Sequence, residues 1–174
     1  MTCKDKHINK VFETEWFSID AIPYVSSNNK PYYRLSCNDS VSIIAKTTEE
    51  KIILVRQYRP AIEDFTLELP SGYVNKGESP EDAVKRELKE ETGFICDSAI
   101  CIGSLKLCPS RINNTLYFFW GRCSRFIKQK GAEDKESELI LVTRKEFRKM
   151  IIEGKYIEVG GIAMFLLAQL KGYL

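Results

Sequence analysis

One acidic stretch, residues 72–94 (GYVNKGESPEDAVKRELKEETGF), constrains the fold of this chain more than any other part of it. Ser79 is a favoured N-cap residue, and Pro80 suits the first position of a helix. Gly93 is placed to end the helix, because glycine readily adopts the left-handed conformation found just past a helix C-terminus. These signals predict a helix that begins after Ser79 and ends at Gly93.

Three glutamates share one face of this predicted helix. At about 100° per residue, Glu90 lies roughly 60° from Glu87 on one side, and Glu91 lies about 40° away on the other. Carboxylates this close repel one another, so a solvated helix gains nothing from them. A hard divalent cation such as Mg²⁺ prefers oxygen ligands. The pattern therefore predicts a metal site, with Val84 and Leu88 on the opposite flank facing a core.

The rest of the chain predicts a mixed α/β (α+β) fold. Residues 1–13 are polar and we expect them to be frayed, and residues 14–38 predict an antiparallel hairpin of strands 16–24 and 31–37. Further strands are expected at residues 41–46, 51–58, 64–69, 100–107, 115–122 and 138–142. Thr143 predicts the start of a helix that ends near Glu153. A last helix, from about 160 to 171, is expected to bury Ile162, Phe165, Leu166, Gln169 and Leu170.

Length and charge limit the possible classes of protein. The 174 residues suit one domain, and a net charge of +2 from 26 basic and 24 acidic residues gives no global attraction to nucleic acid or an anionic membrane. The longest apolar run, residues 162–167, is too short to cross a bilayer. Six cysteines lack zinc-type spacing, and the N-terminus lacks an apolar signal region. We expect a reduced, cytoplasmic, soluble protein with neither nucleic acid nor membrane as a partner.

The acidic stretch resembles the signature of the Nudix hydrolases. That signature reads Gly, five residues, Glu, seven residues, then Arg-Glu-aliphatic-x-Glu-Glu-x-Gly-apolar. No position departs from it, and so many fixed positions in one short stretch rarely arise by chance. The resemblance implies an α/β/α sandwich around a mixed sheet. The matching residues are Gly72, Glu78, Arg86, Glu87, Leu88, Glu90, Glu91, Gly93 and Phe94.

The resemblance also implies a chemistry, the hydrolysis of a nucleoside diphosphate linked to another group. By analogy with the family, Mg²⁺ or Mn²⁺ would be bound by Glu87, Glu91, Glu90 directly or through water, and the Ser71 carbonyl. Arg86 would orient the glutamates through charge-assisted hydrogen bonds. The competing interpretation is a solvated acidic helix face without a metal.

Two segments outside the acidic stretch resemble the ADP-ribose pyrophosphatases within this family. Residues 55–60 (VRQYRP) and 68–72 (ELPSG) match motifs in which the second arginine, here Arg59, reaches a substrate phosphate. The alternative is a surface arginine at the end of a strand. Pro109 also matches, but many members have glycine after it, whereas this chain has Ser110 and Arg111. Arg111 either contacts a phosphate or is a solvated loop residue.

Further residues follow from the same resemblance. These enzymes place a glutamate in a loop before the last strand, where it assists the attacking water or binds another metal. Glu136 is favoured here over Glu138, and a solvated charged loop is the alternative. An aromatic residue from the N-terminal strand commonly stacks on adenine, often from the partner subunit of a dimer. Trp16 is the candidate, with Phe17 and Tyr24 as alternatives, and we expect a homodimer.

The function expected from the sequence is metal-dependent hydrolysis of ADP-ribose or a related nucleoside diphosphate sugar to a nucleoside monophosphate and a sugar phosphate. One alternative is a nucleoside triphosphate pyrophosphohydrolase that clears damaged nucleotides. Another is a Nudix module that binds a nucleotide sugar without cleaving it. The intact set of Glu87, Glu90 and Glu91 argues against the binding module, which has no need for three acids that repel one another.

Overall fold

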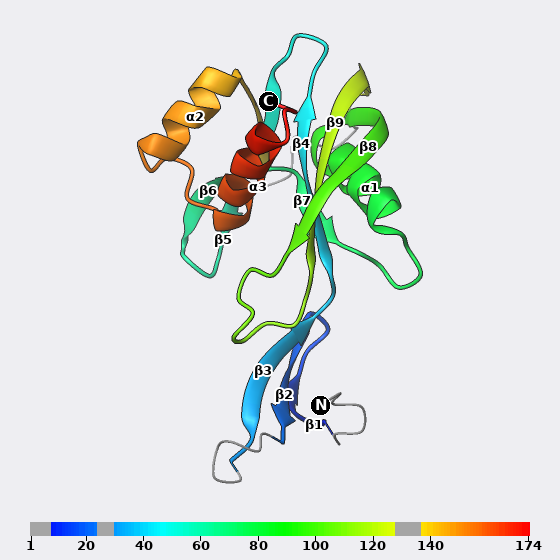
Figure 1. Cartoon of the computed structure of the whole chain (residues 1–174), viewed down its shortest axis with the longest axis vertical. Helices are drawn as coiled ribbons and strands as arrows, with labels where there is room; N and C mark the ends of the chain where they lie inside the picture. The colour runs from blue at the N-terminus through cyan, green and yellow to red at the C-terminus, as the bar shows by residue number, and fades with distance from the viewer. Residues whose placement is uncertain (1–7, 24–29, 128–136) are drawn as a thin grey trace.

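The computed structural model describes residues 8–23, 30–127 and 137–174. Its strands form two separate sheets, and three helices pack on the larger one (Figure 1). In chain order the elements are β1 (Asn9–Glu13), β2 (Phe17–Ile22), β3 (Tyr32–Cys37), β4 (Ser40–Lys46), β5 (Ile52–Arg59), β6 (Asp64–Glu68), β7 (Ser71–Tyr73), α1 (Pro80–Thr92), β8 (Phe94–Leu105), β9 (Leu116–Phe126), β10 (Ser137–Val142), α2 (Arg144–Ile152) and α3 (Val159–Leu170).

The larger sheet is mixed and lies between helices. Its main path runs β10-β5-β4-β9-β8, with β6 paired to β5 and β7 paired to β4. Strand β4 is parallel to β9 and antiparallel to β5 and β7. Helix α1 covers one face, while α2 and α3 cover the other (Figure 1). This arrangement confirms the predicted α/β/α sandwich.

Strand β4 divides the hydrophobic core because its side chains point alternately to the two faces of the sheet. Val41, Ile43 and Ala45 pack against the α1 residues Val84 and Leu88. Ile44 belongs to a second cluster on the other face, together with Ile52, Leu54, Phe118, Phe147, Met164 and Phe165. The predicted core-facing flank of α1 is thus confirmed, since Val84 and Leu88 are fully buried.

Helix α1 begins and ends where the sequence predicted. The Ser79 hydroxyl accepts a hydrogen bond from the Asp82 amide at 3.1 Å. Gly93 has a φ of 75° and its amide donates to the Lys89 carbonyl at 2.9 Å. A positive φ is inexpensive for glycine, so the chain leaves the helix at this point without strain.

The N-terminal region forms a small antiparallel sheet in the order β1-β2-β3. The predicted hairpin is confirmed by the pairing of β2 with β3. The expectation that residues 1–13 are frayed is wrong for residues 9–13, which form β1 against β2. This small sheet projects from one end of the larger one (Figure 1). Residues 1–7 and Tyr24 lie outside the described residues.

Two other predictions differ from the structure. Strand β8 begins at Phe94, directly after the helix, rather than at residue 100, and it keeps its pairing with β9 through several register shifts. Helix α3 buries Met164, Phe165 and Ala168, whereas Leu166 and Leu170 are 56% and 76% exposed. Apolar residues occur all around α3, so their spacing did not specify which face is buried.

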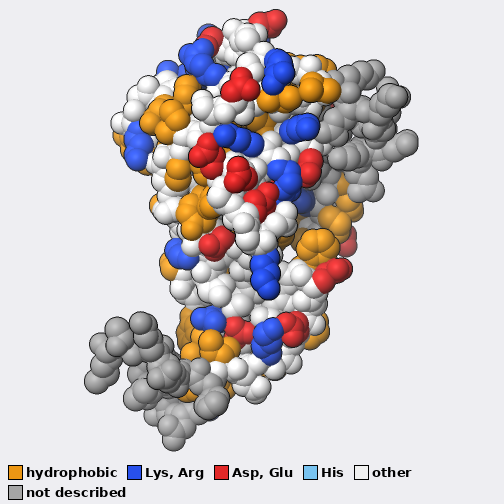
Figure 2. Space-filling model, turned by 90° about the vertical axis from the view of Figure 1, so that its right-hand side faces the viewer, with side chains coloured by type: hydrophobic (Ala, Val, Ile, Leu, Met, Phe, Trp, Pro, Cys, Tyr) orange, Lys and Arg blue, Asp and Glu red, His pale blue; other side chains and the backbone are white. Residues whose placement is uncertain are grey.

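The surface carries a mixture of charges. Figure 2 shows the side of the molecule that includes α1, where acidic and basic side chains are interspersed rather than separated into patches of one sign. Within the described ranges, no helix is long and apolar enough to cross a membrane.

Candidate active site

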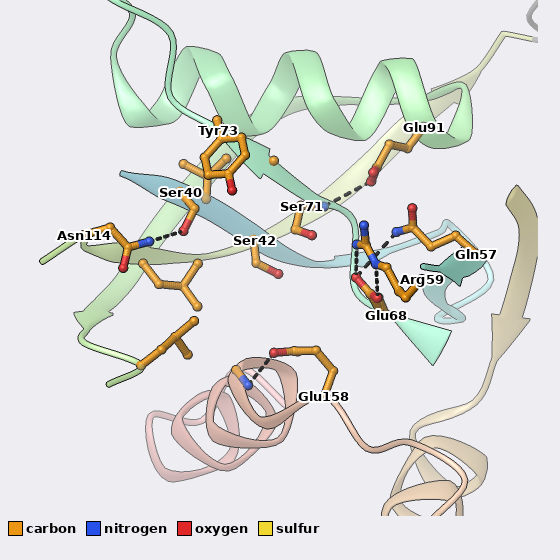
Figure 3. A pocket seen from close by; sticks show the side chains of 15 residues that line it. Ser40, Ser42, Gln57, Arg59, Glu68, Ser71, Tyr73, Glu91, Asn114 and Glu158 are labelled. Carbon is orange, nitrogen blue, oxygen red and sulfur yellow. Dashed lines mark hydrogen bonds and ion pairs between the residues drawn. The ribbon is translucent and has the colours of Figure 1, made fainter. Parts of the chain in front are cut away.

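A pocket of about 330 Å³ opens beside the acidic stretch (Figure 3). Its walls come from β4, β5, β6 and β7, from the last turn of α1, from the loop between β8 and β9 with the first residue of β9, and from the start of α3. One end is charged and is lined by Arg59, Glu68 and Glu91. The other end is polar and apolar without a basic side chain, and is lined by Ser40, Ser42, Tyr73, Leu107, Asn114, Leu116 and Glu158.

Arg59 is fixed in the charged end by Glu68. Its Nε donates to Glu68 Oε1 at 2.6 Å, and its Nη2 donates to Glu68 Oε2, so the pair is bidentate. The Thr66 hydroxyl donates to Glu68 at 2.5 Å and the Gln57 amide donates to it at 3.4 Å. Burial tends to raise the pKa of Glu68, but the hydrogen bonds from Arg59 and Thr66 outweigh it and the pKa is lowered. A guanidinium has five donor hydrogens, so Arg59 keeps donors for a phosphate.

Glu91 is the glutamate of α1 that lines the pocket. Its Oε2 accepts a hydrogen bond from the Ser71 amide at 3.0 Å, which joins the end of α1 to the start of β7 (Figure 3). Burial raises the pKa of Glu91 to about 7, and the negative charges of Glu87 and Glu68 add to this effect. Burial is thus the main reason why the ionised form of Glu91 is disfavoured.

Arg86 connects the other acids of the stretch. Its guanidinium donates to Glu78 at 2.8 and 3.0 Å, to Glu87 at 2.8 Å and to Glu90 at 3.2 Å. It also donates to the Tyr73 carbonyl at 3.0 Å, beside the pocket. Hydrogen bonds from Arg86 are the main cause that lowers the pKa of Glu78 to about 2. Arg86 thus contacts three glutamates of the stretch, and its role in orienting them for a metal stays a prediction.

Glu87 packs directly on the backbone of Gly72. A Cβ at Gly72 would overlap the Glu87 carboxylate, so only glycine leaves room for this contact. Burial raises the pKa of Glu87, against the lowering effect of Arg86. A glycine at the start of the stretch thus brings a carboxylate of the helix against the segment at Ser71.

The residues fit a hard divalent cation by their chemistry. Glu87 and Glu91 supply carboxylate oxygens next to the backbone of Ser71 and Gly72, and burial disfavours their charge unless a cation is present. In the described part of the chain, no three His, Cys, Asp or Glu side chains are grouped closely enough to hold a metal ion as they stand. Glu87 and Glu90 are instead held by Arg86, and Glu91 by the Ser71 amide.

Three of the other predicted site residues, Trp16, Arg111 and Glu138, do not line this pocket. Trp16 is 63% exposed and lines a shallow hollow on the N-terminal sheet. The Arg111 guanidinium lies over the ring of Tyr32, 4.6 Å from its centroid. Glu138 is at the start of β10, 3.8 Å from Arg56. Glu136 lies outside the described residues.

The polar end of the pocket contains residues that sequence reasoning missed. Ser40 and Ser42 alternate along β4, and both face the pocket together with Asn114. Two serines spaced two apart in an otherwise apolar strand are a signal of this lining, because alternate residues share one face. Glu158, at the start of α3, reaches the pocket only because α3 packs against the sheet. The residues around it in the sequence do not indicate that it lines a pocket.

Comparison with known proteins places this geometry in a family. The family model described as NUDIX domain matches residues 38–157. The ADP-ribose pyrophosphatase of Bacillus subtilis is 32% identical over 114 residues, which cover 64% of this chain and 62% of that protein. The ADP-sugar pyrophosphatase of Mus musculus is 40% identical over 83 residues, which cover 45% and 38%. These matches span less than two thirds of either relative.

A solved structure shares the fold. The crystal structure of ADP compounds hydrolase superposes with a TM-score of 0.81, covers 99% of this chain and 98% of its own, and is 20% identical in sequence. The chain belongs to the Nudix family, and the membership and fold expected from residues 72–94 are confirmed.

Proposed function

We propose that this chain hydrolyses the diphosphate of ADP-ribose or a related nucleoside diphosphate sugar. Water attacks a phosphorus of the diphosphate and the anhydride bond breaks, which gives a nucleoside monophosphate and a sugar phosphate. The observation that carries the proposal is that Arg59 and Glu91 face one pocket. Its charged end suits a diphosphate, because a guanidinium binds phosphate oxygens well.

Mg²⁺ or Mn²⁺ is the proposed cofactor, held by Glu87, Glu90, Glu91 and the Ser71 carbonyl. When bound, such an ion neutralises phosphate charge and makes water a better nucleophile. The chain's own residues orient the reactants: Glu68 fixes Arg59 toward the diphosphate, and Arg86 holds the glutamates in place. Glu136 is proposed to assist the attacking water.

We also propose that the enzyme works as a cytoplasmic homodimer. The N-terminal sheet exposes Val11, Phe12, Trp16 and Tyr33 by 55%, 52%, 63% and 51%. Exposed apolar side chains on a projecting sheet are typical of an interaction surface. A partner subunit that covers this sheet would bring Trp16 near the neighbouring site, where it could stack on the base. The five cysteines in the described ranges are free thiols, which agrees with a reducing compartment.

The proposal is tested by product analysis. Purified protein is incubated with Mg²⁺ and a panel of nucleotide sugars, dinucleoside polyphosphates and nucleoside triphosphates, and the release of AMP, GMP and UMP is measured. We expect a nucleoside monophosphate and a sugar phosphate from a nucleotide sugar. Pyrophosphate from a triphosphate as the main product would instead establish a triphosphate pyrophosphohydrolase. Binding of ADP-ribose without AMP release would establish a binding module.

A further inference from the structure

The end of the pocket away from Arg59 is lined by groups that can form hydrogen bonds with hydroxyls. Ser40, Ser42 and Asn114 line it from the sheet side, and the Asn114 amide donates to the Ser40 hydroxyl at 3.5 Å. Ser42 is only 7% exposed, yet no hydrogen bond of its hydroxyl is found among the described residues. A nearly buried hydroxyl that faces a pocket without a partner is available to a ligand.

Glu158 faces this end from α3, across the pocket from Ser42 (Figure 3). Its carboxylate accepts hydrogen bonds from the Gly160 amide at 2.6 Å and the Gly161 amide at 2.5 Å. The Tyr156 hydroxyl lies 3.4 Å from its second oxygen, and that hydroxyl accepts a hydrogen bond from the Leu69 amide at 3.2 Å. The carboxylate is therefore fixed in position by three donors.

Glu158 still has capacity to accept from a ligand. A carboxylate offers about four lone-pair sites, and these protein donors use three of them. Glu158 is half-buried, so the remaining site is open to the pocket. A fixed anion of this kind accepts from a hydroxyl donor and repels a phosphate, because like charges at close range disfavour each other.

We propose that this end of the pocket binds the sugar of the nucleoside diphosphate sugar, with Glu158 accepting a hydrogen bond from a sugar hydroxyl and Ser42 donating one. This inference rests on the proposed function, and it makes Glu158 and Ser42 specificity-determining residues. The diphosphate at Arg59 places its attached group toward Ser42, since both lie in one continuous pocket.

A sugar suits this end better than a base or a third phosphate. Each sugar hydroxyl both donates and accepts, which matches serine hydroxyls, an amide and a carboxylate. Leu107 and Leu116 supply apolar contact for the ring carbons. A base would be expected to stack between flat aromatic faces, and Tyr73 is the aromatic residue that lines the pocket. A third phosphate would meet the negative charge of Glu158.

The test compares two substrates that differ only in the sugar. ADP-ribose and the β-methyl ester of ADP share the adenosine and the diphosphate diester, so their kcat/KM ratio isolates the sugar contribution. We expect wild type to prefer ADP-ribose. Glu158→Gln should lower this preference by about tenfold, and Ser42→Ala by about threefold, as for lost hydrogen bonds to charged and neutral groups. Ser42→Ala leaves the cap of α3 intact, so it remains informative if Glu158→Gln folds poorly.

A matched control separates recognition from helix capping. Glu146 accepts a hydrogen bond from the Thr143 amide at 2.7 Å in the first turn of α2, and it does not line the pocket. Glu146→Gln should keep the wild-type preference between the two substrates. Hydrolysis of ATP is a second measurement. Its kcat/KM relative to that of ADP-ribose should rise in Glu158→Gln, because the negative charge that repels a third phosphate is gone.

Binding distinguishes the possible failures. Calorimetry with the non-hydrolysable α,β-methylene analogue of ADP-ribose should show the same order of variants as the kinetics. If wild type binds this analogue with the expected variant effects but cleaves no nucleotide sugar, the proposed function fails and the sugar site stands. If both variants keep the wild-type sugar preference, the inference is overturned. It is also overturned if they instead alter the preference between ADP-ribose and GDP-ribose, because the pocket then takes the base.

Discussion

At the scale of single residues, the site depends on two arginines that compensate acids in different ways. Arg59 forms a bidentate pair with Glu68, which fixes the direction of its guanidinium in the pocket. Arg86 donates hydrogen bonds to Glu78, Glu87 and Glu90. Its positive charge offsets the repulsion between these three carboxylates. Neither arginine donates a hydrogen bond to Glu91, which accepts one from the Ser71 amide, and a bound cation would balance its charge.

Glu91→Gln should separate activity from stability. We expect turnover of ADP-ribose with Mg²⁺ to fall by about a hundredfold or more, because the proposed metal site loses one of its carboxylates. The pKa of Glu91 is raised from 4.5 to about 7, so the stability it contributes is fully present below about pH 4.5 and is lost as pH rises through about 7. Without metal, the variant should therefore melt higher than wild type at about pH 8, and the difference should vanish at about pH 4.5.

Thermal unfolding with a chelator, at both pH values, measures the stability part of this prediction. Lys85→Gln is a suitable control, since it breaks an exposed pair with Glu81 on the same helix and lies outside the pocket. Near-normal turnover in Glu91→Gln would sink the proposed chemistry. An unchanged melting temperature at about pH 8 would contradict the assignment of buried, uncompensated charge to this residue.

At the scale of elements, the sequence predicts a feature well where neighbouring residues decide it, and poorly where tertiary packing decides it. The bounds of α1 followed from Ser79, Pro80 and Gly93, because capping is decided by neighbouring residues. Strand β1 was missed, since Asn9–Glu13 is exposed along its length and is held by pairing with β2 rather than by burial. The buried face of α3 was misassigned, because a helix that is apolar all around takes its orientation from its contacts.

Gly161 shows what orients α3. A Cβ at this position would overlap the Tyr156 hydroxyl, which itself is bonded to the Leu69 amide beside the pocket. Gly161→Ala should gain helix propensity, yet we expect a net loss of about 1–3 kcal/mol in the free energy of unfolding from overpacking. Denaturant titration measures this loss. Adding Tyr156→Phe removes the nearest atom, so the double variant should recover part of the loss; full additivity of the two changes would argue against the contact.

At the scale of the whole molecule, the pocket is assembled from all three layers of the sandwich. Glu91 comes from α1 on one face of the sheet, Arg59 from the sheet itself, and Glu158 from α3 on the other face. The motif at residues 72–94 could predict the first of these, and the segment at 55–60 the second. Glu158 could not be predicted, since only the packing of α3 against the sheet brings it to the pocket.

Trp16 lies next to the projecting N-terminal sheet and is 63% exposed. Trp16 does not line the pocket of its own chain, so we expect it to act in the site of a partner subunit. Size-exclusion chromatography with light scattering should give the mass of a dimer. Trp16→Ala should raise KM for ADP-ribose by about tenfold, the effect expected from losing one stacked base.

A heterodimer of two different variant chains tests whether Trp16 acts in the site of its own chain or in the site of the partner subunit. One chain carries Trp16→Ala and the other Glu91→Gln, and two different affinity tags allow the mixed dimer to be purified. If Trp16 acts across the interface, one of the two sites combines an intact Glu91 with an intact Trp16, so about half of the wild-type activity at low substrate should return. If Trp16 acts within its own chain, neither site is complete and the activity is about half that of the Trp16→Ala homodimer, because only one site keeps Glu91. The low value would overturn the role of the partner while leaving the proposed reaction in place.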